Sequence, residues 1–172
     1  MGRRHTSEAL ASEIQRFTGR RCWSFYVGES TGSALVLDFE PKVSRRIPLL
    51  NPRLSEEERY YRGEFSIYIE CAWRLDSDTQ VVCGSGDSPA EGESMSRGLT
   101  RILRRSVESM TVAKPAWDLT VRFGDGLTLT AFCDQPGDAE EDLTDYSCSL
   151  SNVVYVVGPR GRVRCEPRQR ES

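Results

Sequence analysis

The chain has 172 residues, 38% of them apolar, and a formal net charge of −3. A chain of this length is expected to form one domain that buries a core without metals or disulfide bonds. It has no apolar run near the ~20 residues of a membrane-spanning helix, and its first residues lack the apolar stretch of a secretory signal. We therefore expect one cytoplasmic domain over residues 6–166, with disordered ends at 1–5 and 167–172.

Alternation of apolar and polar residues predicts that most of the chain is strand. In chain order, the expected elements are a helix at 6–19, strands at 22–27 and 34–39, a short helical turn at 55–61, strands at 64–75 and 80–83, a helix at 93–105, and strands at 107–113, 117–123, 127–134, 146–150, 153–157 and 162–165. Short turns join successive strands, which indicates antiparallel pairing. The expected fold class is α+β, a mostly antiparallel sheet of about 8–10 strands with two helices packed on one side of it.

The expected helices follow from residue spacing. In the first helix, Leu10, Ile14 and Phe17 share one apolar face. Between the two long helices, Ser55 and Glu58 have the spacing of a capping box, which predicts a short helical turn. The second long helix carries arginines on its outer face: Arg97, Arg101 and Arg104.

The clearest element is a hairpin around the loop at residues 124–126. A three-residue loop sets Phe123 opposite Leu127, whereas a two-residue loop would mix apolar and polar faces. The same register predicts three further pairs on one apolar face: Val121 with Leu129, Leu119 with Ala131, and Trp117 with Cys133. We therefore expect a type I turn with Gly126 in the left-handed conformation as a bulge residue.

The six cysteines include no Cys-x-x-Cys pair and no nearby histidine. Zinc sites usually need closely spaced ligands, so the sequence favours buried, reduced cysteines and predicts neither a metal nor another cofactor. One alternative stays open. A three-residue loop at 76–78 would set Cys71 opposite Cys83, where the two thiols could form a disulfide or a redox pair.

The sequence offers no complete catalytic motif. Its single histidine, His5, lies in the end expected to be disordered, which leaves no rigid base for a Ser-His-Asp or Cys-His arrangement. Glycine-rich nucleotide-binding motifs are also absent. Asp38, Glu40 and Lys42 resemble the carboxylate-x-Lys pattern of Mg²⁺-dependent nucleases, but Pro41 interrupts them and no second strand supplies an acidic partner. We expect no enzyme, and a Mg²⁺-dependent nuclease stays an alternative.

Two charged features are candidate binding surfaces. An acidic stretch without basic residues lies between two expected strands: Asp134, Asp138, Glu140, Glu141, Asp142 and Asp145. On a rigid β scaffold, such a stretch suits a basic protein partner. The helix arginines, and Arg160, Arg162 and Arg164 near the C-terminus, could bind phosphates or carboxylates. The net negative charge favours a protein over a nucleic acid.

A spaced set of scaffold residues covers the last third of the chain: Trp117, Leu119, Phe123, Asp125, Gly126, Leu129, Phe132, Tyr146, Ser147 and Glu166. This pattern is similar to one in small, uncharacterised bacterial proteins. Some of these resemble immunity proteins encoded beside toxins, and others belong to bacterial conflict and defence loci. The resemblance carries no catalytic residue.

These features together predict a non-enzymatic protein-binding module, either a bacterial immunity protein or an accessory subunit of a toxin or antiphage defence complex. Partner contacts are expected first from the acidic stretch and second from the helix arginines: Asp138, Glu140, Glu141, Asp142, Arg97, Arg101 and Arg104. The alternative from a different class is a nucleic-acid-binding module that uses the arginine faces. No membrane contact is expected, and the oligomeric state stays open.

Overall fold

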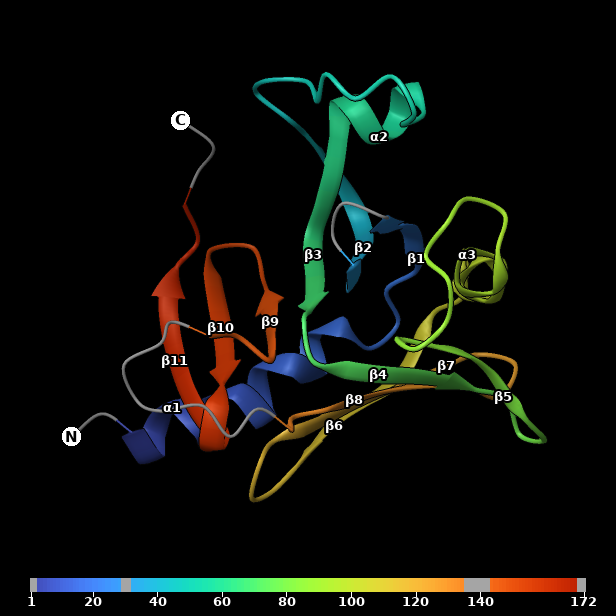
Figure 1. The fold of residues 1–172 in the computed structure, drawn as a ribbon. Coiled ribbons are helices and arrows are strands. Elements are labelled where there is room, and N and C mark those ends of the chain that lie inside the picture. Colours follow the sequence, from blue (N-terminus) through green and yellow to red (C-terminus); the bar gives the residue numbers. More distant parts are fainter. Residues whose placement is uncertain (1–2, 29–31, 135–142, 170–172) are drawn as a thin grey trace.

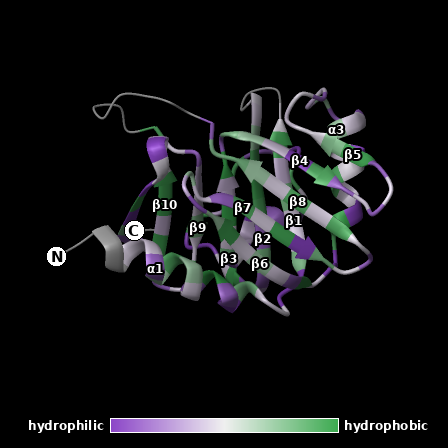
Figure 2. Cartoon of the chain, turned by 90° about the horizontal axis from the view of Figure 1, so that it is seen from below, coloured by the Kyte–Doolittle hydropathy of each residue, from purple (hydrophilic) through white to green (hydrophobic). Residues whose placement is uncertain are grey.

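The computed structural model describes residues 3–28, 32–134 and 143–169, which form two antiparallel sheets (Figure 1). The six-stranded sheet has the order β1 (Cys22–Gly28), β2 (Gly32–Ser44), β3 (Tyr61–Ile69), β9 (Tyr146–Ser149), β10 (Val153–Gly158), β11 (Arg162–Pro167). The five-stranded sheet has the order β5 (Val81–Gly84), β4 (Ala72–Asp76), β8 (Leu127–Phe132), β7 (Asp118–Phe123), β6 (Val107–Ala113). Hydrophobic and hydrophilic bands alternate along the strands, as expected for sheets with one buried face (Figure 2).

Three α-helices are present in the described residues: α1 (Arg3–Glu13), α2 (Glu56–Tyr60) and α3 (Ser94–Leu99). Short 3-10 turns extend α1 and α3 or precede β11: Ile14–Phe17, Thr100–Ile102 and Pro159–Gly161. The α+β class and the mostly antiparallel pairing are confirmed, and residues 3–28, 32–134 and 143–169 contain three helices in place of two and eleven strands in place of about 8–10. None of the described helices is both long and apolar enough to cross a membrane.

The expected strand over 64–75 is in fact two strands in different sheets. The chain leaves β3 at Ile69 and enters β4 at Ala72, and β4 then runs across the direction of β3 (Figure 1). At this corner the backbone amides of Glu70 and Cys71 both donate to the Asp145 carbonyl, at 2.8 and 3.0 Å. One strand therefore belongs to each sheet, and the corner joins them.

The central hairpin is confirmed in register. Phe123 pairs with Leu127, Val121 with Leu129, and Leu119 with Ala131. The turn itself differs from the expected type I geometry, because Asp125 has a positive φ of 63° in addition to Gly126 at 71°. The pairing ends before Trp117 and Cys133, which lie outside the two strands.

The first helix closes one end of the core. It begins at Arg3 rather than at Thr6, and its 3-10 extension places the Phe17 ring edge-on against Phe39 and Phe65, with centroids 5.4 and 5.3 Å apart. The helix contacts β11 of one sheet, while the extension contacts β6 of the other. The two expected helices therefore do not share one side of a single sheet. The second is also shorter than expected and ends at Leu99.

β2 extends beyond its expected end at Phe39 and continues to Ser44. The chain passes Pro41 because the register with β3 shifts between Phe39 and Lys42. Gly63 lies opposite this shift, and a Cβ atom there would be 2.8 Å from the Phe39 nitrogen and 2.4 Å from the Phe65 carbonyl oxygen. Only glycine fits this close approach of two backbones.

Candidate functional site

The segment between β2 and β3, residues 45–60, projects beyond the ends of these strands and carries α2 (Figure 1). We call it the α2 arm. The predicted capping box is present: the Glu58 amide donates to the Ser55 hydroxyl at 3.2 Å, and the Ser55 amide donates to the Glu58 carboxylate at 2.9 Å. These reciprocal bonds fix a helix that is too short to be stable alone.

The arm is tied to the six-stranded sheet by polar contacts. The second oxygen of the Glu58 carboxylate accepts a hydrogen bond from the Ser24 hydroxyl on β1, at 3.0 Å. Arg45 donates its side-chain Nε to the Tyr61 carbonyl at 3.0 Å. The Leu49 amide donates to the Arg59 carbonyl at 3.0 Å, which closes the arm on itself.

A pocket of about 410 Å³ lies between the arm and the face of β1 and β2. Its apolar lining comes from both the sheet and the arm: Trp23, Tyr26, Val36, Leu49, Leu50 and Leu54. Ser24, Asp38, Arg45 and Glu58 contribute polar groups. A mainly apolar hollow of this size with a few polar groups is typical of a site that holds a small ligand or one side chain of a partner.

Trp23 is the most distinctive residue of this pocket. Its indole nitrogen is buried and has no hydrogen-bond partner among the described residues. The Lys42 ammonium group lies 4.7 Å from the centre of the ring. An unmet buried donor costs about 1–3 kcal/mol, so a carbonyl or carboxylate oxygen that reached it would be favoured.

The environment of the pocket alters the carboxyl group of Asp38. Burial raises the pKa of Asp38, while a hydrogen bond from the Gly63 amide and the positive charges of Arg45, Arg168 and Arg62 act in the opposite direction. Burial prevails. A carboxyl with a perturbed pKa in a concave site is typical of binding and catalytic sites.

Exposed hydrophobic side chains gather around the same arm. Five of the eight large hydrophobic side chains exposed in the described residues lie on the arm or at its junction with β3: Ile47, Leu49, Leu50, Tyr60 and Tyr61. Leu50 is 90% exposed and Ile47 67%. Single exposed apolar residues are ordinary, but a group around one pocket marks an interaction site.

The structure tests the position of only some predicted partner contacts. The four acidic contacts lie outside the described residues: Asp138, Glu140, Glu141 and Asp142. Arg97, Arg101 and Arg104 are exposed on and after α3, and none of them lines the pocket. Asp145, the last member of the acidic stretch, is only 1% exposed, so it does not belong to an acidic surface.

The nuclease pattern does not converge on one site in the structure. Asp38 lines the pocket under the α2 arm, whereas Glu40 and Lys42 line a separate hollow beside Gly19. The Lys42 ammonium forms an ion pair with Glu57 on α2. The two carboxylates therefore face different spaces and do not form a shared Mg²⁺ site.

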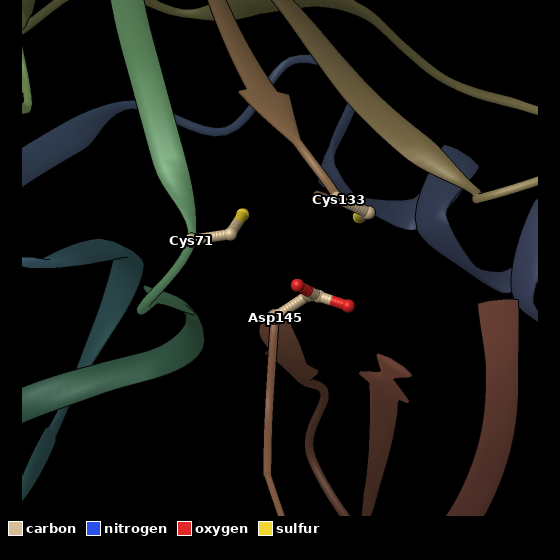
Figure 3. A group of neighbouring side chains, drawn as sticks. All are labelled: Cys71, Cys133 and Asp145. Carbon is tan, nitrogen blue, oxygen red and sulfur yellow. The ribbon is translucent and has the colours of Figure 1, made fainter. Parts of the chain in front are cut away.

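The cysteine pairing also differs from the expected alternative. Cys83 lies opposite Leu75 in the β4–β5 ladder, and Cys71 lies instead beside Cys133 and Asp145 (Figure 3). All six cysteines are free thiols. A hydrogen bond with Cys71, and then burial, raise the pKa of Cys133, so this thiol is not a thiolate nucleophile at neutral pH.

Sequence reasoning found the capping box but missed the pocket. The only signal was a pair of adjacent leucines at positions 49 and 50 between two prolines, which no helix or strand period explains. No protein-family model, curated protein or solved structure matches the chain. The geometry of the site is therefore the basis for its interpretation.

Proposed function

We propose that the chain is a non-enzymatic protein-binding module, and that the α2 arm is its docking surface. The observation that carries this proposal is the group of exposed apolar side chains around the pocket, above all Leu50, which is 90% exposed. Burying a leucine side chain contributes about 1.5–3 kcal/mol. A protein surface with no partner would gain nothing from presenting several such groups together.

The occupant that we propose is an apolar side chain of the partner, seated in the pocket between Trp23 and the arm. The Trp23 indole nitrogen is buried, so a backbone carbonyl of the partner would accept its hydrogen bond only if the pocket opens as the anchor enters. Such an apolar anchor with one oriented hydrogen bond is how many interfaces concentrate their binding energy.

The charge of the arm predicts how the interaction responds to salt. The arm contains four arginines and three glutamates, so its formal net charge is only +1: Arg45, Arg46, Arg53, Arg59, Glu56, Glu57 and Glu58. Binding through the arm should therefore depend weakly on ionic strength. Binding to nucleic acid through the arginine faces would instead weaken steeply as salt rises.

The partner that we propose is a toxin or a defence-complex subunit, the class expected from the pattern of residues in the hairpin region. The acidic stretch and the exposed arginines of α3 are proposed as additional contacts of that partner. These arginines are separable from the arm by mutation, because Arg97, Arg101 and Arg104 do not line the pocket.

The test is a pull-down of the tagged full chain from its host, comparing wild type with Leu50→Asp and Val81→Asp. Val81 is the matched control, since it is 60% exposed but lies on β5, away from the arm. We expect wild type and Val81→Asp to capture a protein in equal amounts at low and moderate salt. Leu50→Asp should capture at least about tenfold less of the same protein. Equal capture by both variants would refute docking through the arm. Recovery of nucleic acid alone would favour the arginine faces.

A further inference from the structure

Three side chains that are far apart in the sequence meet where the two sheets join. They are Cys71, at the corner between β3 and β4, Cys133, just after β8, and Asp145, just before β9. The two sulfur atoms and one carboxylate oxygen all lie within 4.8 Å of one another. Figure 3 shows the three side chains directed toward a common point.

The backbone holds each of the three positions. Ala72 pairs with Phe132 in the β4–β8 ladder, so Cys71 and Cys133 are the next residues along two neighbouring strands. The Asp145 carbonyl accepts the Cys71 amide at 3.0 Å. The Cys133 amide in turn donates to the Asp118 carboxylate at 2.8 Å. The group is therefore positioned by both sheets rather than by one mobile loop.

The residue types indicate which ions fit this group. Zinc binds cysteine sulfur at about 2.3 Å and carboxylate oxygen at about 2.0–2.2 Å, usually with four tetrahedral ligands. Such bond lengths put neighbouring ligand atoms about 3.3–3.8 Å apart, so atoms that lie within 4.8 Å of one another must close by at most about 1–1.5 Å. Thiols are poor ligands for Mg²⁺ and Ca²⁺, which take oxygen.

The three residues differ in burial. Cys71 is 3% exposed and Asp145 is 1% exposed, while Cys133 is only partly buried. An ion could enter from the side of Cys133, and solvent on that side could supply a further ligand. Zinc sites with three protein ligands keep such an open position for water.

We propose that Cys71 and Cys133, as thiolates, and Asp145 bind one zinc ion, with a water molecule as the fourth ligand; the ion displaces the two thiol protons, which are released to solvent. Because the ligands belong to segments of both sheets, the bound ion cross-links the sheets at their junction and stabilises the folded chain. This site does not depend on the proposed docking function, since none of its three residues lines the pocket under the α2 arm.

The test uses the full chain, reduced and stripped of metal, and titrated with Zn²⁺ and separately with Co²⁺. We expect one ion per chain, a rise in melting temperature with zinc, and a thiolate-to-cobalt charge-transfer absorption in the near ultraviolet. X-ray absorption of the zinc-loaded chain should show two sulfur neighbours at about 2.3 Å. The same chain with Cys165→Ser is the control, because Cys165 is exposed on β11 and does not belong to the group.

Cys133→Ser is the informative variant. Cys133 is only partly buried, so a serine there should disturb the fold less than a serine at the buried Cys71. It should keep the circular dichroism of the wild type and lose at least about tenfold in zinc affinity, whereas Cys165→Ser should bind as wild type does. Unchanged zinc affinity in Cys133→Ser would overturn the proposal. If that variant does not fold, the wild-type spectra decide: a cobalt complex without thiolate absorption, or zinc without sulfur neighbours, overturns it equally.

Discussion

The indole nitrogen of Trp73 donates a hydrogen bond of 2.7 Å to the carbonyl oxygen of Ser33. Trp73 lies on β4 and Ser33 on β2, so this bond joins the two sheets across the core. The Trp73 side chain is 2% exposed. The contrast with Trp23 is direct, because the buried indole nitrogen of Trp23 has no partner among the described residues.

This contrast predicts opposite outcomes for the same substitution. Trp73→Phe should lower the free energy of unfolding by about 2 kcal/mol, since it leaves the Ser33 carbonyl without its donor and removes part of a buried ring. Trp23→Phe removes an unmet donor and should leave stability unchanged or slightly higher. Urea denaturation of the two variants measures both values. An equal loss of unfolding free energy in the two variants would show that the volume of the ring, and not the hydrogen bond, determines the effect.

A second prediction concerns the close approach of β2 and β3. Gly63→Ala should lower the free energy of unfolding by about 3 kcal/mol, because the new Cβ would lie within 2.8 Å of backbone atoms that cannot move aside easily. Gly86→Ala is the control, since a Cβ there meets no atom within 4 Å. Thermal or urea unfolding checks both. An unchanged free energy of unfolding in Gly63→Ala would mean that the backbone at the register shift between β2 and β3 moves to make room for the new Cβ.

The elements set by neighbouring residues were predictable from the sequence. The hairpin register from Leu119 to Ala131 followed from a period of two and a glycine-rich turn, both of which are local. The corner at Glu70 and Cys71 was not predictable. Buried side chains alternate on both sides of it, and this alternation does not record which sheet each strand joins.

The candidate sites depended on contacts between distant segments. The capping box of Ser55 and Glu58 was predicted because its two members are three residues apart, but the pocket that it supports is built from β1, β2 and the arm together. Cys71 and Cys133 become neighbours only through the β4–β8 register. Asp145 was grouped with the acidic stretch because composition gives the charge of a residue and not its burial.

A third prediction separates the two roles of Glu58. Ser55→Ala removes the N-cap acceptor, which is worth about 1 kcal/mol, so the Glu58 and Arg59 amides should exchange hydrogen about five times faster. Ser24→Ala leaves the cap intact and removes only the bond to β1, so it should affect these amides less. Glu58→Ala keeps the Ser55 hydroxyl as the N-cap acceptor but removes the carboxylate that accepts from both the Ser55 amide and the Ser24 hydroxyl, so its effect should exceed that of Ser24→Ala. Hydrogen exchange followed by NMR gives each rate, and an equal effect of all three would refute the separation.

The last prediction concerns Asp38 and pH. Burial raises the pKa of Asp38 in the folded chain, so the folded state binds its proton more strongly than the unfolded chain does. The stability that this proton contributes is complete below the unfolded pKa and is lost as pH rises through the folded pKa. Asp38→Asn keeps an acceptor for the Gly63 amide but never ionises. The unfolding free energy of the variant should therefore rise relative to wild type as pH rises from the unfolded pKa of Asp38 through its higher folded pKa.

Urea denaturation of both chains at several pH values measures this difference, and Asp134→Asn, at an exposed position, controls for the loss of one negative charge. Arg45, Arg62 and Arg168 lower the pKa of Asp38 and so oppose the effect of burial. A difference that falls as pH rises would mean that these arginines stabilise the carboxylate more than burial destabilises it. The pocket under the α2 arm would then contain an ionised Asp38 whose charge the arginines balance, rather than a carboxyl group that readily accepts a proton.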